Sequence, residues 1–356
     1  MEKTRLGKTG LMVTRSAFGA LPIQRLSAEE AVSLLRAALD GGINFFDTAR
    51  AYTDSESKLG AAFSGRRDEV IIATKSHAAT GEELTKDLLT SLSELRTDHV
   101  DVYQLHFAKK CHAPGEPDGL YDAVVRAKSE GKVLHIGLTT HRLDVALTAA
   151  RSGFYETLQF PLSCLSSEKD LEVVELCRAG DIGFIAMKAL SGGLITDAEA
   201  SLAWMKQHDN VVPIWGIQRK SELDEFLELE RRGVRLDDDI RTRIEKVRSE
   251  LSGNFCRGCG YCLPCPSDID IPWIARMPYV LRRMVAANFM TEEWRARITR
   301  VKDCLHCGLC RTRCPYELDT PLLIELAYED YENFSEKWER TMPDSNAQAI
   351  AKGEES

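Results

Sequence analysis

Short β-rich runs alternate with longer amphipathic segments from about residue 14 to residue 232, and this alternation constrains the fold more than any other feature of the sequence. The eight runs expected to form strands are Val13–Ala17, Asn44–Phe46, Val70–Thr74, Val100–Leu105, Val133–Leu138, Thr157–Phe160, Gly183–Met187 and Val211–Trp215. Strands that alternate with helices favour a parallel sheet, and eight such units in a chain of this length predict an α/β fold of the (β/α)8 type.

A doubly wound sheet is the competing arrangement. It would need fewer strand–helix units, and it would usually carry a glycine-rich fingerprint after the first strand. The segment Phe18–Pro22 (FGALP) stands there and is no such fingerprint. The first expected helix, Ser27–Leu39, begins with Ser27 as N-cap and Glu30 three residues later, and it stops before Gly41. These signals favour the closed TIM barrel.

Cysteine is distributed unevenly along the chain. Eight of the 11 cysteines fall between Cys256 and Cys314, whereas Cys111, Cys164 and Cys177 are scattered through the first two thirds. The N-terminal segment Met1–Gly10 has no apolar core of the signal-peptide type, so we expect a cytoplasmic protein whose thiols stay reduced. The eight cysteines are therefore expected to bind metal rather than to form disulfides.

The charge balance and the hydropathy pattern narrow the class of partner. The formal net charge is -9, whereas a general nucleic-acid binder would usually be basic, so no nucleic-acid partner is expected. No apolar run is long enough to span a bilayer, so no membrane partner is expected either.

Four polar side chains are expected at the carboxyl ends of the strands, where enzymes on this barrel place their chemistry. Asp47 ends the second strand and Tyr52 follows in its loop, while Lys75 ends the third strand. His106 follows the fourth strand. An ammonium near a tyrosine lowers its pKa, so Lys75, held by Asp47, would prepare Tyr52 to donate a proton. His106 would donate a hydrogen bond to the same carbonyl oxygen.

The segments that carry these residues resemble the aldo-keto reductases, over roughly residues 3 to 230. The similar elements are Asp47–Tyr52 (DTARAY), Ile72–Lys75 (IATK), Asp101–His106 (DVYQLH) and the opening Arg5–Leu11 (RLGKTGL). A lone lysine or histidine at a strand end is usually structural, but the ordered set of four is specific. The resemblance implies that Asp47, Tyr52, Lys75 and His106 are the catalytic residues of an NAD(P)-dependent oxidoreductase.

The same resemblance implies NADP or NAD as cofactor and assigns its nicotinamide end. Thr139-Thr140 stand where the family has Ser-Asn against the carboxamide, so hydroxyls would have to replace the amide. Gln159 matches the carboxamide-binding glutamine. Met187 stands where an aromatic residue usually stacks on the nicotinamide, so the ring would lie on a thioether.

The phosphate end of the cofactor is assigned to the loop after the last strand. Gly216 permits close approach of the backbone, and Arg219 could pair with the 2'-phosphate of NADP. An arginine exposed at the start of a helix is the alternative interpretation of Arg219. Glu222 and Phe226 stand where family members often carry Gln and Asn against the adenosine, which leaves the choice between NAD and NADP open.

The cysteine-rich segment contains two runs of four cysteines, each followed by proline. The ligands expected from the first run are Cys256, Cys259, Cys262 and Cys265, and those from the second are Cys304, Cys307, Cys310 and Cys314. The second run has the spacing of bacterial ferredoxins, and the first is one residue short in its last gap. In such folds the fourth cysteine of each run binds the other cluster, so two [4Fe-4S] clusters are expected. Structural zinc is the alternative.

These patterns divide the chain into three parts. We expect the barrel over residues 1–250, a small α-rich ferredoxin-like domain with two [4Fe-4S] clusters over residues 251–335, and a mobile tail over residues 336–356. The stretch between the cysteine runs is basic and could form a docking face for an acidic electron carrier, or simply a solvated helix face.

Two functions are compatible with the sequence. The first is reduction of an aldehyde or ketone, or oxidation of the alcohol, with Tyr52 as general acid and with clusters that transfer electrons or stabilise the structure. The second is an electron-transfer or redox-sensing protein that uses the barrel to bind a nucleotide. The complete set of four catalytic side chains favours the first.

Overall fold

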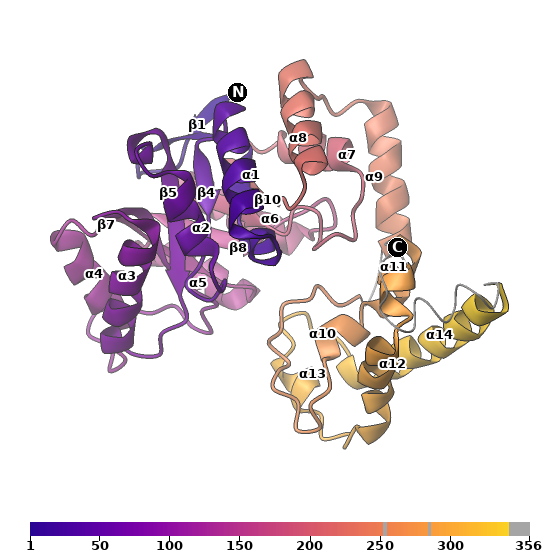
Figure 1. Ribbon diagram of the computed structural model, residues 1–356. Coiled ribbons are helices and arrows are strands. Elements are labelled where there is room, and N and C mark those ends of the chain that lie inside the picture. The colour runs from indigo at the N-terminus through magenta and orange to yellow at the C-terminus, as the bar shows by residue number, and fades with distance from the viewer. Residues whose placement is uncertain (252–254, 284–285, 342–356) are drawn as a thin grey trace. The chain divides into compact units, whose positions relative to one another are not determined.

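The computed structural model describes residues 1–251, 255–283 and 286–341, and the chain divides into two compact units (Figure 1). The barrel unit contains residues 1–190 and 197–248. The cysteine unit contains residues 191–196 together with the chain from Ser249 onward. The short segment 191–196 follows a barrel strand in sequence but packs with the cysteine unit.

Eight parallel strands form the closed barrel that the sequence predicts, in the order β10-β3-β4-β5-β6-β7-β8-β9. Their bounds are β3 Ala17–Gly19, β4 Phe45–Asp47, β5 Ile71–Ser76, β6 Val100–Leu105, β7 Val133–Thr139, β8 Thr157–Pro161, β9 Gly183–Met187 and β10 Val211–Gly216. All eight run in the same direction, so their carboxyl ends meet at one rim.

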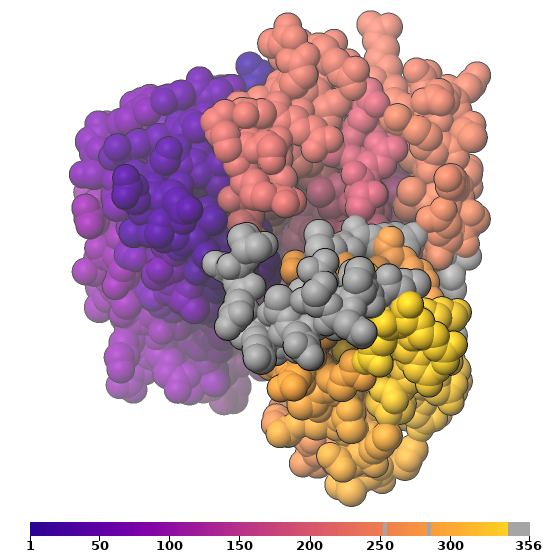
Figure 2. Space-filling model, turned by 45° about the vertical axis from the view of Figure 1, so that its right-hand side comes forward, coloured from indigo at the N-terminus to yellow at the C-terminus, as the bar shows by residue number. Residues whose placement is uncertain are grey.

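Helices alternate with these strands and form the outer surface of the barrel unit, from indigo and purple to salmon in Figure 2. They are α1 Ala28–Asp40, α2 Ser55–Ala62, α3 Gly81–Leu95, α4 Leu120–Ser129, α5 Leu143–Ser152, α6 Glu168–Ala179, α7 Ala198–Met205, α8 Lys220–Arg232 and α9 Asp238–Leu251, with 3-10 turns η1 Leu21–Arg25 and η2 Arg67–Glu69. The predicted capping box of α1 is confirmed: Ser27 Oγ accepts from Glu30 N, and the Glu30 carboxylate accepts from Ser27 N.

The prediction for the first strand is wrong in its bounds. Residues Met12–Thr14 form β2, which pairs antiparallel with β1 (Lys3–Arg5), and the barrel strand β3 begins only at Ala17. The chain turns between them because Thr14 Oγ1 donates to Ser16 O at 2.8 Å and Thr14 N donates to Asn44 Oδ1 at 2.7 Å.

The hairpin packs against the inward-facing side chains of the strands. Leu6 and Val13 join a buried cluster with Ala17, Phe45 and Val102. The hairpin thus covers apolar side chains of the strands at the amino-terminal end of the barrel. The polar side chains remain at the carboxyl ends.

All regular secondary structure in the described part of the cysteine unit is helical, and loops join the helices. Its elements are α10 Ile271–Ile274, α11 Met277–Arg283, η3 Ala286–Phe289, α12 Glu292–Thr299, η4 Arg300–Asp303, α13 Leu309–Arg313 and α14 Thr320–Thr341. Helix α14 packs against α10, α11 and α13. Residues 336–341, which we expected in the tail, continue α14, and the rest of the expected tail lies outside the described residues.

A helix that crosses a membrane must be both long enough and apolar enough. None of the helices among residues 1–251, 255–283 and 286–341 meets both requirements.

Candidate active site

The structure brings Asp47, Tyr52, Lys75 and His106 together at the carboxyl rim. Strands β4 and β5 pair in parallel. Asp47 is the last residue of β4 and Lys75 the last but one of β5, and their side chains are 2% and 1% exposed. Lys75 Nζ donates to Asp47 Oδ1 at 2.6 Å and also to the carbonyl oxygen of Thr48. The lysine is therefore held by a buried ion pair and a backbone acceptor.

Tyr52 lies in the turn before α2, beside this pair. Lys75 Nζ is 5.2 Å from the centre of the Tyr52 ring. The ring of His106, just after β6, meets the Tyr52 ring edge-on with the ring centres 6.0 Å apart. A hydroxyl donor, an ammonium and an imidazole therefore share one partly buried site.

Two glutamines that point into the barrel hold Asp47 from the other side. Gln104 Nε2 lies 3.3 Å from Asp47 Oδ2 and 3.0 Å from Gln159 Oε1. Gln159 Nε2 lies 3.4 Å from Asp47 Oδ1. Gln159, expected at the nicotinamide carboxamide, thus also positions the catalytic carboxylate, and Gln104 is a residue that the sequence analysis missed.

The electrostatics of the site differ from the expectation in one respect. Burial raises the pKa of Tyr52 above its usual 10, and the opposing effect of Lys75 is smaller. The charge of Asp47 adds to the increase, because it offsets the lysine. Burial also raises the pKa of Asp47, although Lys75 and both glutamines oppose this shift. Lys75 therefore limits the increase in the pKa of Tyr52 rather than producing a net decrease.

His106 is neutral at neutral pH. Burial, followed by the charge of Lys75, lowers the pKa of His106 far below its ordinary value. Among the described residues, His106 Nδ1 is buried and has no hydrogen-bond partner. The ring of His77 stacks on the His106 ring with their centres 3.9 Å apart. The sequence analysis did not single out His77, because stacking across two strand ends has no local sequence signal.

The hydroxyls of Thr139 and Thr140 hold the loop after β6. Thr139 Oγ1 accepts from Phe107 N at 2.9 Å. Thr140 Oγ1 donates to Ala108 O at 2.8 Å and accepts from Arg142 N at 3.1 Å. Both side chains are buried. The hydrogen bonds given above join their hydroxyl groups to the protein backbone.

The residues expected at the cofactor's other contacts lie at the ends of β9 and β10. Met187 ends β9 and is half-buried, and Gly216 ends β10 and is exposed. Arg219 forms the N-cap of α8, and its guanidinium pairs with Glu222 at 2.7 Å. Phe226 is buried and stacks on Trp215 with the ring centres 4.5 Å apart, so it belongs to the core.

Glu222 occupies the amino-terminal end of α8. Its Oε2 accepts from Gln218 N at 2.8 Å and from Arg219 N at 3.0 Å. These are the N–H groups of the N-cap and of the residue before it, and the contact to the N-cap is part of a capping box. The carboxylate places a negative charge at the start of α8, which disfavours a second anion there.

The first group of four cysteines in the cysteine unit is Cys256, Cys259, Cys262 and Cys314. Burial raises the pKa of Cys262, and the thiolates of the other three raise it further. Thiolates affect one another in this way only at close range. The fourth cysteine of the second run thus lies with the first three of the first run.

The other four cysteines share a small cavity. Cys265, Cys304, Cys307 and Cys310 line it, together with Cys262 of the first group and with Pro321 and Ile324 from helix α14. The second group therefore adjoins the first at Cys262, and the crossed arrangement of ligands around two clusters stays a prediction.

The spacing of the sulfurs bears on the zinc alternative. Four sulfurs around one zinc would lie about 3.8 Å apart, given Zn–S bonds of about 2.3 Å in a tetrahedron. Among the described residues, which include all eight cysteines, no three sulfurs lie within 4.8 Å of one another. The described sulfurs are therefore not gathered around a single zinc position.

The three remaining cysteines lie in the barrel unit. Cys177 on α6 is fully buried, and burial raises the pKa of its thiol to about 12. Burial raises the pKa of Cys164 to about 11. Cys111 is half-buried, and burial raises the pKa of its thiol too. Thiols shifted in this direction are poor nucleophiles, and none of these three belongs to either run of four cysteines.

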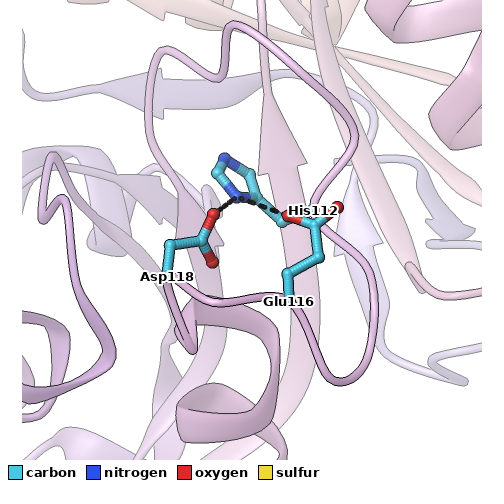
Figure 3. A group of neighbouring side chains, drawn as sticks. All are labelled: His112, Glu116 and Asp118. Carbon is cyan, nitrogen blue, oxygen red and sulfur yellow. Dashed lines mark hydrogen bonds and ion pairs between the residues drawn. The ribbon is translucent and has the colours of Figure 1, made fainter.

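His112, Glu116 and Asp118 form another group with metal-binding side chains (Figure 3). His112 Nδ1 lies 3.1 Å from Asp118 Oδ2 and 3.9 Å from Glu116 Oε2. Lys110 Nζ contacts both carboxylates, at 2.8 Å from Asp118. This ammonium offsets one of the two carboxylate charges, and these contacts join residues of the loop before α4.

The basic stretch between the cysteine runs is largely paired within the protein. The ion pairs are Arg282–Asp330, Arg295–Glu339, Arg297–Asp270 and Arg300–Asp268. Paired charges attract a docking partner less strongly than free ones. The docking of an acidic electron carrier on this stretch stays a prediction.

Comparisons with known proteins assign both parts of the chain. The sequence profile of the aldo/keto reductase family matches residues 15–212, which is more than half of the chain. The chain belongs to the aldo/keto reductase family. A 4Fe-4S dicluster domain profile matches residues 255–319, which contain all eight cysteines of the two runs.

Individual relatives match the barrel part. The uncharacterized oxidoreductase YrpG of Bacillus subtilis is 30% identical over 225 residues, covering 55% of this chain and 68% of the relative. L-galactose dehydrogenase of Arabidopsis thaliana is 30% identical over 216 residues, with the same shares covered. The aldo-keto reductase AKR11C1 from Bacillus halodurans, at 22% identity and a TM-score of 0.60, covers 69% of this chain and 96% of its own, and shows the shared fold.

Proposed function

We propose that this member of the family reduces an aldehyde or ketone with a nicotinamide cofactor, or oxidises the corresponding alcohol, and that Tyr52 is the general acid. The observation that carries the proposal is the buried Lys75–Asp47 pair beside Tyr52 and His106. This arrangement supports reduction over an electron-transfer or redox-sensing role, because a module that only bound a nucleotide would not need a buried ion pair beside a tyrosine.

The side chains divide the work of proton transfer. A bound nicotinamide supplies the hydride that adds to the carbonyl carbon. His106, neutral because of its lowered pKa, donates a hydrogen bond to the carbonyl oxygen and polarises it. Tyr52 donates its hydroxyl proton to that oxygen, which becomes the alcohol. Lys75 then stabilises the tyrosinate until solvent returns the proton.

The preferred cofactor is NADH. Glu222 fills the start of α8 and pairs with Arg219, so the 2'-phosphate of NADPH would have to displace a carboxylate from its donors. A carboxylate at such a position accepts a hydrogen bond from a ribose hydroxyl instead. The structure thus favours the opposite cofactor from the one that Arg219 alone suggested.

The cysteine unit holds two [4Fe-4S] clusters in our proposal. The first is bound by Cys256, Cys259, Cys262 and Cys314, and the second by Cys265, Cys304, Cys307 and Cys310. Each cluster would accept or donate one electron at a time, whereas a hydride transfers two. The clusters therefore exchange electrons with an outside one-electron carrier or stabilise the unit, and they do not take electrons directly from the nicotinamide.

The test uses full-length protein prepared without oxygen. Oxidation of NADH is followed with a panel of aldehydes and ketones, in wild type and in Tyr52→Phe. We expect turnover to fall about a hundredfold or more in the variant, as is typical for loss of a general acid. Full activity in Tyr52→Phe would disprove the proposed mechanism. Stoichiometric zinc without iron in the same preparation would disprove the clusters.

A further inference from the structure

Arg276 lies in the turn between α10 and α11, and its side chain reaches two other segments of the cysteine unit. Its Nη2 donates to the carbonyl oxygen of Gly192 at 2.8 Å and lies 3.4 Å from that of Ser191. Both belong to the segment 191–196, which packs with this unit. Two backbone acceptors thus fix the guanidinium in place.

The same guanidinium packs against the loop of the first cysteine run. A Cβ atom at Gly258 would lie only 2.8 Å from Arg276 Nη1 and 3.4 Å from its Cδ. Gly258 also has a positive φ of +63° and donates its N–H to Cys256 Sγ at 3.3 Å. The backbone between the first two cysteines of the run can therefore approach the arginine only because residue 258 is glycine.

Arg276 differs from its basic neighbours in having no anionic partner. Arg282, Arg295, Arg297 and Arg300 each pair with a carboxylate. Within residues 1–251, 255–283 and 286–341, no carboxylate pairs with Arg276, and its buried Nε has no hydrogen-bond partner. A partly buried cation without a counter-charge is unfavourable, so its place in the fold calls for an anion.

The anionic group beside Arg276 in this unit is the thiolate of Cys256. Burial lowers the pKa of Arg276, and the negative charge of the Cys256 thiolate is the one influence that opposes this. A [4Fe-4S] core with four thiolates is negative overall and gains one further negative charge on reduction. A fixed positive charge beside it therefore stabilises the reduced form more than the oxidised form.

We propose that Arg276 is the counter-charge of the cluster bound by Cys256, Cys259, Cys262 and Cys314, and that it raises the reduction potential of this cluster. The inference rests on the two clusters proposed above. The step concerned is uptake of one electron from an external one-electron donor, with no bond formed or broken and no proton moved. The two clusters consequently differ in potential, with the first cluster easier to reduce than it would be without Arg276.

The test is a redox titration of full-length, anaerobically prepared protein, followed by electron paramagnetic resonance with dithionite as reductant. Arg276→Met removes the charge, Arg276→Lys keeps it, and Arg282→Met is the control because Arg282 is paired with Asp330. We expect Arg276→Met to make reduction of one cluster at least about tenfold less favourable, which corresponds to about 59 mV for one electron. Arg276→Lys should shift less, and Arg282→Met should leave both potentials unchanged.

Cysteine variants identify the cluster that responds. The titration step that moves should persist in Cys307→Ser and disappear in Cys259→Ser. The proposal is overturned if Arg276→Met keeps both clusters and neither potential changes, or if Arg282→Met has the same effect. If Arg276→Met loses the first cluster, Arg276→Lys decides: retention supports a role for the charge, and loss in both overturns it. If the wild-type protein contains two clusters but the Arg276 variants leave both potentials unchanged, this inference is disproved and the proposal of two clusters stands.

Discussion

The imidazole of His77 lies against that of His106, with the ring centres 3.9 Å apart and the ring planes inclined by 25°. His77 follows β5, while His106 follows β6. Because His106 Nδ1 has no hydrogen-bond partner among the described residues, ring contacts such as this stacking orient the His106 imidazole. His77 is a positioning residue for the proposed reaction.

Replacing His77 with Ala should slow carbonyl reduction roughly 2- to 10-fold, because ring stacking contributes about 0.5 to 1.5 kcal/mol. The loss should lie in kcat more than in KM, since the ring positions His106 rather than binding substrate. His77→Phe is the matched control, because it keeps a flat ring without a titratable nitrogen. Equal losses in both variants would show that the stacking is not the reason.

Gln104 is expected to matter for stability as well as for activity. It donates to Asp47 and to Gln159, and all three side chains are buried. Replacement by Met keeps the volume but removes a hydrogen bond from a buried carboxylate. The free energy of unfolding of the barrel should fall by about 1 to 3 kcal/mol, measured by urea titration. A variant as stable as wild type would show that Lys75 and Gln159 hold Asp47 without Gln104.

The fold and the grouping of Asp47, Tyr52, Lys75 and His106 at one rim could be predicted because their signals are local. Alternating strands and helices specify the barrel, and Asp47, Lys75 and His106 stand at successive strand ends. The contacts of Gln104 and His77 could not be predicted, because they depend on which side chains of neighbouring strands face each other across the barrel. The β-rich run at Val13 was misassigned because a hairpin strand and a barrel strand have the same composition.

The cofactor contacts were the least predictable part for a similar reason. Position along the chain identified Thr139, Thr140 and Arg219, but not what their polar atoms bind. In the structure the two threonines hold a loop, and Arg219 pairs with Glu222. A polar side chain near a site has a free atom for a ligand only if the protein does not use that atom first.

The stability of the barrel should depend on pH through His106 and His141. Burial lowers the pKa of both histidines in the folded protein, so the unfolded chain binds more protons below its ordinary value of about 6.5. The free energy of unfolding should therefore fall as the pH drops below about 6.5, by about 1.4 kcal/mol per pH unit for each histidine.

Urea unfolding between about pH 7.5 and about pH 5 checks this expectation, with His141→Asn as the comparison. In that variant the free energy of unfolding should change less steeply with pH, by about 1.4 kcal/mol per pH unit, because one titrating histidine has been removed. An unchanged slope in His141→Asn would mean that His141 is not neutral in the folded barrel.

Since His106 stays neutral and Tyr52 stays protonated, the rate of carbonyl reduction should be nearly constant from about pH 6.5 to about pH 9.

The preference for NADH should reverse when the charge of Glu222 is removed. Glu222→Gln keeps the hydrogen-bonding length of the side chain but frees Arg219 and removes the carboxylate from the start of α8. The Kd for NADPH should fall roughly 5- to 50-fold, on the scale of about 1 to 2 kcal/mol for charge-assisted contacts, while the Kd for NADH rises slightly. Arg219→Ala in the wild-type background should affect both cofactors little, because its guanidinium is engaged with Glu222. In the Glu222→Gln background the same change should abolish the gain for NADPH. Tighter binding of NADPH than of NADH by the wild type would contradict the assignment of Glu222.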